Sequence, residues 1–150
     1  MKLAEALQER ADLNRKIEQL KARLSNNCLV QEGETPAENP EELLDELNSS
    51  ALRLEELMAK INLTNSTTKI NGTSLTELIA KKDRLSLQLQ AYREIINESS
   101  RTAYRARGSE IKILPAVKVS ELQKKSDELS KELRLTDNLL QENNWKTELI

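Results

Sequence analysis

The strongest constraint on this chain is a spacing of three and four residues between apolar side chains, which recurs in four separate stretches. Such spacing is the heptad seam of helices that pack along one narrow stripe. The first stretch runs from about residue 3 to residue 24, and its seam consists of Leu3, Ala6, Arg10, Leu13, Ile17, Leu20 and Leu24. The pattern predicts a mainly α protein.

The other three stretches open with N-terminal helix signals. Asn39 and Pro40 are a capping residue and a first-turn proline, and residues 74–77 and 120–123 have the spacing of a capping box. Asn71-Gly72 marks a tight turn before the third helix, and Gly108 is expected to end that helix as the longest of the four. The three seams are Leu43, Leu47, Ser50, Leu54, Leu57, Ile61, Thr64 and Thr68; Leu75, Leu78, Lys82, Leu85, Leu89, Tyr92, Ile96, Ser99 and Ala103; and Leu122, Ser126, Leu129, Leu133, Thr136, Leu140 and Asn143.

Composition favours a narrow core. Aromatic residues make up 2% of the 150 residues and Phe is absent, whereas a thick globular core usually uses aromatic side chains. We therefore expect a single domain over residues 1–150, an elongated antiparallel helical bundle with coiled-coil-type packing. The residues expected to be among the most buried are Leu13, Ile17, Leu20, Leu54, Leu57, Leu85, Leu89, Leu129 and Leu133.

Two short segments between the helices have the character of strands. Leu29–Gln31 and Glu110–Leu114 are expected to pair as a small antiparallel two-stranded β-ribbon, which Pro115 would end because proline has no N–H to donate. Cys28, beside the first of these segments, is expected to be a small buried apolar group.

The residue types leave little for catalysis. The chain has no His, one Cys and three isolated Gly residues, so it lacks imidazole bases, a thiolate metal cage and a phosphate-binding glycine loop. We predict no enzyme activity, no metal and no cofactor. The net charge of -2 argues against a nucleic-acid partner. The lone Cys, the lack of a signal sequence and the lack of a long apolar run indicate a cytoplasmic protein with no membrane partner.

Two groups of residues are candidates for interactions. Trp145, Leu149 and Ile150 form an apolar C-terminus, which is expected to dock in a groove at a subunit contact of a homo-oligomer. Deleting residues 144–150 would then lower the oligomeric state or the thermal stability; the alternative is that the tail packs on its own chain. The second group could contact an anion or nucleic acid, or merely complement the end of the third helix, and consists of Arg101, Tyr104, Arg105 and Arg107.

The chain also resembles a family of small, uncharacterised bacterial proteins, some of which carry the label septicolysin. The resemblance rests on stretches such as MKLAEALQERADLNRKIEQLKARL, VQEGETPAENPEELLDEL and QENNWKTEL. The label implies a cytolysin, but the family provides no activity that can be assigned to particular residues. From the residues we expect a non-enzymatic structural or protein-interaction bundle that self-associates. The alternative is a membrane-active, pore-forming protein.

Overall fold

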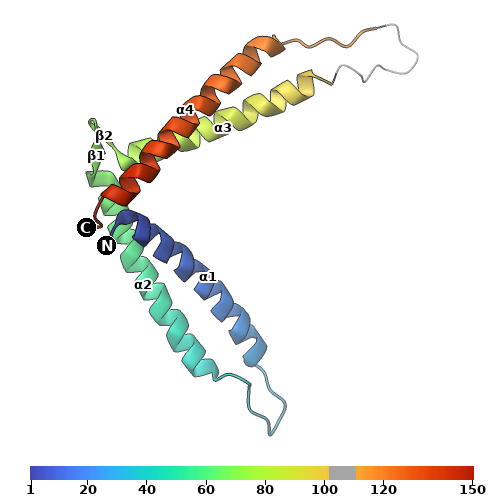
Figure 1. Cartoon of the computed structure of the whole chain (residues 1–150). Coiled ribbons are helices and arrows are strands. Elements are labelled where there is room, and N and C mark those ends of the chain that lie inside the picture. Colours follow the sequence, from blue (N-terminus) through green and yellow to red (C-terminus); the bar gives the residue numbers. More distant parts are fainter. Residues whose placement is uncertain (102–110) are drawn as a thin grey trace. The chain divides into compact units, whose positions relative to one another are not determined.

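The protein is described by a computed structural model, which describes residues 1–101 and 111–150. The described residues form four long helices and a small antiparallel sheet, so the mainly α fold with a two-stranded ribbon is confirmed (Figure 1). In chain order the elements are α1 (Leu3–Asn27), α2 (Pro40–Thr67), β1 (Lys69–Ile70), β2 (Thr73–Ser74), α3 (Leu75–Ser99) and α4 (Val119–Lys146).

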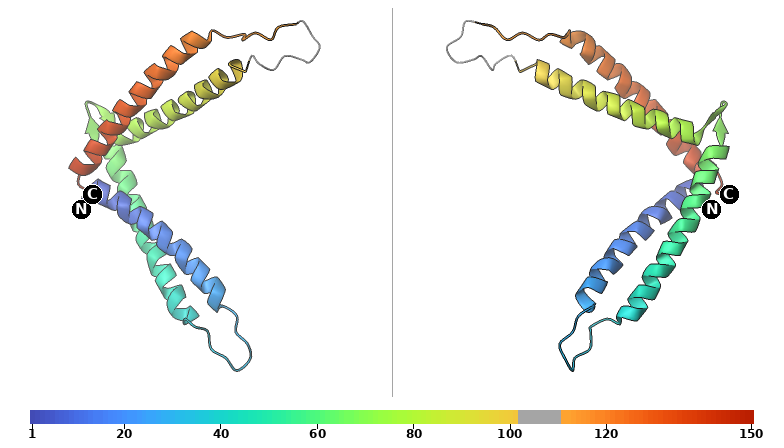
Figure 2. Two further views of the ribbon diagram at one scale, coloured as in Figure 1. Left: turned by 45° about the vertical axis from the view of Figure 1, so that its right-hand side comes forward. Right: turned by 180° about the vertical axis from the view of Figure 1, so that it is seen from behind.

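The chain divides into two compact units. The first comprises Met1–Ser74 together with Glu142–Ile150, and it contains α1, α2 and the sheet. The second comprises Leu75–Gln141, and it contains α3 and most of α4. Within each unit the two long helices lie side by side and run in opposite directions (Figure 2). Each unit is thus built on one antiparallel helix pair.

The predicted seams lie at the contact within each pair. Every seam position in the described residues is buried or half-buried, including the polar Ser50, Thr64, Ser126 and Thr136. Leu20, Leu57 and Leu85 have no exposed surface, whereas Leu13, Ile17, Leu54, Leu129 and Leu133 are half-buried. The expectation that these five residues would be among the most buried was therefore wrong. A pair of helices covers a seam from one side only, which leaves positions at its edges half-buried.

The two-stranded ribbon is present, but its predicted location was wrong. Residues 29–31 and 111–114 contain no strand, and Glu110 lies outside the described residues. The sheet pairs Lys69 with Ser74 and Ile70 with Thr73 instead. Asn71 and Gly72 both have positive φ, 51° and 86°, as a two-residue type I′ hairpin requires. A tight local turn closes such a ladder at little entropic cost, whereas the predicted pairing would have joined segments about eighty residues apart.

The predicted helix starts agree closely with the structure, but one predicted end does not. The Asn39 side chain accepts a hydrogen bond from the Glu41 N–H (3.0 Å), and Pro40 is the first residue of α2. Helix α3 ends at Ser99 and is not the longest; Gly108, its expected end, lies outside the described residues. The Ser100 hydroxyl donates to the Ile96 carbonyl oxygen (2.7 Å), a local bond of the kind that competes with helix propagation.

The first and last residues are joined by backbone pairing, which we call the terminal clasp. Residues 1–3 and 147–149 form it, with the Leu3 N–H donating to the Thr147 carbonyl and the Leu149 N–H to the Met1 carbonyl, each at 2.9 Å. Glu148 forms ion pairs with Lys2 and the N-terminal amine, and these cations lower the pKa of its carboxyl. The tail thus packs on its own chain.

The seam predicts a contrast between two leucines of α2. Replacing the fully buried Leu57 by alanine should lower the free energy of unfolding by about 2–5 kcal/mol, because a cavity replaces packed methyl groups. The matched control is Leu52→Ala on the same helix, whose side chain is 68% exposed; it should change stability by less than about 0.5 kcal/mol. Urea unfolding in dilute solution measures both, and equal losses would contradict the seam.

The terminal clasp predicts the effect of a truncation. Deleting Thr147–Ile150 removes the two backbone bonds of the clasp and the bond from the Ile150 N–H to the Thr64 hydroxyl (3.1 Å). Three bonds worth about 1 kcal/mol each correspond to a decrease in Tm of roughly 10 °C. Circular dichroism should show this decrease with little loss of helix signal at room temperature. An unchanged Tm would show that the clasp contributes nothing to stability.

Candidate functional site

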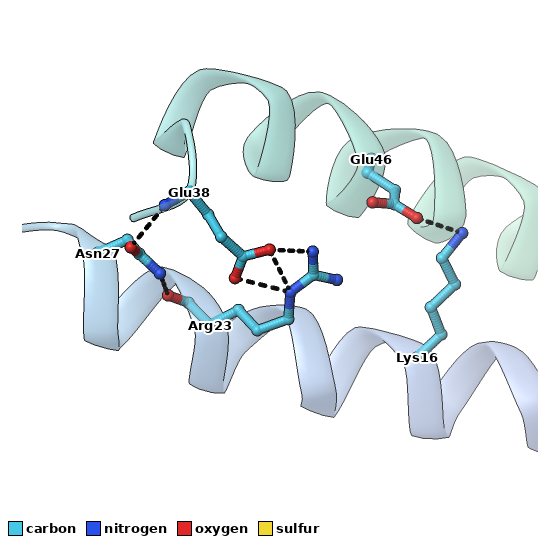
Figure 3. Close-up of polar contacts among 5 residues, drawn as sticks. All are labelled: Lys16, Arg23, Asn27, Glu38 and Glu46. Carbon is cyan, nitrogen blue, oxygen red and sulfur yellow. Dashed lines mark hydrogen bonds and ion pairs between the residues drawn. The ribbon is translucent and has the colours of Figure 1, made fainter. Parts of the chain in front are cut away.

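Three ion pairs connect α1 to α2 and fix how the two helices align. Their α1 members, Glu9, Lys16 and Arg23, are seven residues apart, so they lie on one side of the helix. Arg53 donates to both carboxylate oxygens of Glu9 (2.7 and 3.1 Å), and Lys16 pairs with Glu46 at 2.8 Å. Arg23 pairs with Glu38, just before α2 begins (Figure 3). A slip of α2 by one turn would separate all three pairs.

The pair at Arg23 anchors the connection between the helices. The Glu38 carboxylate accepts hydrogen bonds from the Arg23 guanidinium, which lowers the pKa of the carboxyl and raises that of the arginine. The buried Asn27 side chain donates to the Arg23 carbonyl (2.8 Å) and accepts from the Glu38 N–H (3.0 Å) (Figure 3). These contacts hold the two ends of the segment between Asn27 and Glu38 together.

A hollow of about 610 Å³ lies at this end of the helix pair. Cys28, Val30, Pro36 and Pro40 give it an apolar character, and Glu41 is the acidic residue among those that line it. Cys28 is exposed, so the expectation that it is buried was wrong. The reason is that helix α1 ends at Asn27, so Cys28 falls in the connecting segment instead of on a packed helix face.

This end of the first unit is strongly acidic. Residues 24–52 contain seven Asp or Glu residues and no Lys or Arg. Glu38 and Glu46 are paired with cations of α1, but the other five form no ion pair within the described chain. Sequence reasoning did not select this region as a site, although the absence of Lys and Arg over such a length was a usable signal. The unpaired carboxylates are Glu32, Glu34, Glu41, Glu42 and Asp45.

The second unit has its own polar contacts between helices. Lys82, which lies on the predicted seam, pairs with Asp137 (2.5 Å), and Lys81 pairs with Glu132 (2.8 Å). Each lysine lowers the pKa of the carboxyl it contacts. A groove of about 350 Å³ beside the Lys82 pair is lined by Arg93 and Arg134, which form no ion pair with any described residue. Both are exposed surface cations, and nothing in the groove selects a particular anion.

The predicted interaction residues are divided among the first unit, the second unit and a stretch that lies outside the described residues. Trp145 and Ile150 are more than half exposed near the terminal clasp, while Leu149 is half-buried there. Arg101 belongs to the second unit and pairs with Glu98 of α3 (3.4 Å). Tyr104, Arg105 and Arg107 lie outside the described residues. The interaction roles of all these residues therefore stay predictions.

Residues 1–101 and 111–150 contain no group of three or more Cys, Asp or Glu side chains placed to hold a metal ion. In the same ranges, no helix combines the length and the apolar character that crossing a bilayer requires.

Comparison with known proteins places the chain among relatives of unknown role. Residues 10–149 match the model of DUF6847, a family of unknown function. The chain is also similar to the crystal structure of a functionally unknown conserved protein from Corynebacterium diphtheriae, with a TM-score of 0.94. The two are 37% identical, over 100% of this chain and 99% of that one. No curated protein matches the chain.

The expected membership in an uncharacterised family is confirmed in this coarser form. Neither the family description nor the description of the Corynebacterium protein mentions septicolysin. The match covers α1 from Arg10 onward and the whole of the other three helices. The chain therefore belongs to the DUF6847 family of unknown function.

Proposed function

We propose that this protein is a non-enzymatic structural or interaction protein that acts as a self-associated helical bundle. The supporting observation is that each helix pair buries one stripe per helix and leaves other large apolar side chains uncovered. On the helices, the exposed members of this set are Leu44, Leu52, Met58, Leu63, Ile79, Leu87, Ile95, Leu135 and Trp145.

Helix α3 shows most clearly that a helix pair leaves large apolar side chains uncovered. Leu85 and Leu89 face α4 and are buried, whereas Leu87 and Ile95 are 69% and 45% exposed. Positions 87, 91 and 95 are four residues apart, so Leu87, Ala91 and Ile95 form a stripe on a side of α3 that its seam does not use. Helical bundles usually surround their apolar positions with three or four helices. A second copy of the chain would supply the missing helices.

A binding role also fits the available side chains. With no His anywhere in the chain, the commonest general base is missing, and the charged residues that connect the helices of each pair are engaged in ion pairs.

A net charge of -2 gives no general attraction to nucleic acid. We place the protein in the cytoplasm, where an exposed, unpaired thiol such as that of Cys28 stays reduced.

The alternative implied by the septicolysin label is a membrane-active protein. We prefer self-association because the polar faces carry both signs of charge, whereas surface-binding amphipathic helices are usually rich in Lys and Arg. Dye release from liposomes distinguishes the two functions. The account predicts no release at micromolar protein, and rapid release would favour the membrane-active protein.

The proposal predicts a mass above 17.1 kDa in solution. Sedimentation velocity at increasing micromolar concentrations should show a multiple of that mass. Replacing Leu87 and Ile95 together by glutamine should shift association to higher concentration, because the stripe loses apolar area, while Tm in dilute solution changes little. A wild-type protein that stays at 17.1 kDa throughout would contradict self-association. A double variant that associates like the wild type would show that the α3 stripe takes no part in association.

A further inference from the structure

The hollow at the end of the α1–α2 pair combines apolar surface with negative charge. We call residues 28–45 the acidic tip. Leu29 is 88% exposed and Val30 is 52% exposed, so apolar side chains lie open beside the hollow of about 610 Å³. The five carboxylates without an ion pair belong to the same stretch. Burying this apolar surface would be favourable only against a partner that also brings positive charge.

The segment leading into α4 has the opposite character. We call residues 111–125 the basic end; they contain four lysines and one acidic residue, Glu121. Lys118 pairs with Glu121 at 3.5 Å, whereas Lys112, Lys124 and Lys125 form no ion pair with any described residue. Large apolar side chains are exposed here too, with Ile111 at 78% and Leu114 at 74%. An exposed apolar segment thus lies among unpaired cations.

The segment rests against the end of α3, which gives it a support. Ile113, Leu114 and Pro115 line a small hollow of about 230 Å³ together with Glu98 and Arg101. The contact covers only part of these side chains, since Ile113 remains 50% exposed and Leu114 74% exposed. Residues 111–117 therefore present an apolar surface outward, while the acidic tip presents an apolar hollow.

We propose that the acidic tip of one copy binds the basic end of a second copy, with the apolar segment 111–117 seated in the hollow beside Cys28 and Val30. The occupant is a second copy because both surfaces are exposed in the single chain and are complementary in charge and in apolar character. The inference rests on the self-association proposed above and names the surfaces that make it. Opposite charges at the two surfaces would orient the copies, and the uncovered helix stripes would supply further area.

Symmetry adds a consequence. Each chain carries one acidic tip and one basic end, so two copies related by a two-fold axis can form the contact twice. Such a pair is closed and uses both surfaces of both chains. Where the two contacts close in this way, the species is a dimer of discrete mass, because no acidic tip or basic end is left over to add a third copy; a contact that does not close adds further copies.

A charge-swap experiment on the full chain tests the inference. One variant carries Glu32→Lys and Glu34→Lys in the acidic tip, and the other carries Lys112→Glu and Lys124→Glu in the basic end. All four residues are exposed and form no ion pair within the described chain, so each variant should fold as the wild type does. At low salt, each variant alone should associate at least about tenfold more weakly, because like charges then meet.

Mixing the two variants should restore association, because each retained wild-type surface meets its natural partner and the reversed surfaces match each other. The control for the acidic-tip variant is Glu55→Lys with Glu94→Lys, which makes the same change in net charge as that variant on exposed helix positions outside both surfaces. It should associate as the wild type does.

Three results would overturn the inference. If both charge-swap variants associate like the wild type, the contact lies elsewhere, although self-association itself stands. If the control weakens association equally, or if mixing restores nothing, the effect comes from net charge and the two surfaces do not pair. A wild-type protein that stays at 17.1 kDa would overturn the proposed function and the inference together.

Discussion

The structure depends on the narrowness of its hydrophobic seam. Leu and Ile side chains are interspersed along it with a few small or hydroxyl-bearing residues, and Phe is absent from the chain. Buried residues such as Ser50, Thr64 and Ala6 bring little volume, so two helices can pack closely without a third to fill the space. Because the seam is narrow, each unit consists of a single layer of two helices. Apolar residues outside the seam then remain exposed, and the proposed association follows from that surplus.

Charged residues add what a uniform leucine seam lacks, which is a defined alignment. A leucine stripe tolerates a slip of one heptad because the next leucine occupies the same place. The pairs Glu9–Arg53, Lys16–Glu46 and Arg23–Glu38 all favour one alignment of α1 on α2. Individually such exposed pairs contribute little to stability. Their value lies in specificity, and the unpaired charges at the acidic tip and the basic end extend the same principle to a second copy.

The sequence predicted the helices well because heptad spacing and capping residues are local signals. Asn39, Pro40 and Ser74 marked helix starts to within a residue, and every described seam position is buried or half-buried. The predicted place of the ribbon was wrong because strand character at residues 29–31 is a weaker signal than the turn chemistry of Asn71-Gly72, whose positive φ angles close a hairpin between adjacent residues. The predicted end of α3 at Gly108 was wrong because the helix already ends at Ser99, next to Ser100, whose hydroxyl bonds to the Ile96 carbonyl.

The candidate site was harder to predict than the fold. A hollow such as that beside Cys28 depends on where a connecting segment runs, and no residue pattern encodes that path directly. The acidic run from residue 24 to residue 52 is visible in the sequence, but the sequence does not show which of its carboxylates form ion pairs. Only the structure shows that Glu38 and Glu46 are engaged by α1 while neighbouring carboxylates are not.

The central claim is that the chain self-associates, with the acidic tip of one copy bound to the basic end of another. Hydrogen exchange followed by mass spectrometry, at a low and a high protein concentration, tests it most directly, because segments outside helices exchange fast unless they are covered. The account predicts that amides in residues 28–38 and 111–118 exchange more slowly at high concentration, while those buried in the middle of α1 do not change. Exchange in both segments that is independent of concentration would contradict the account.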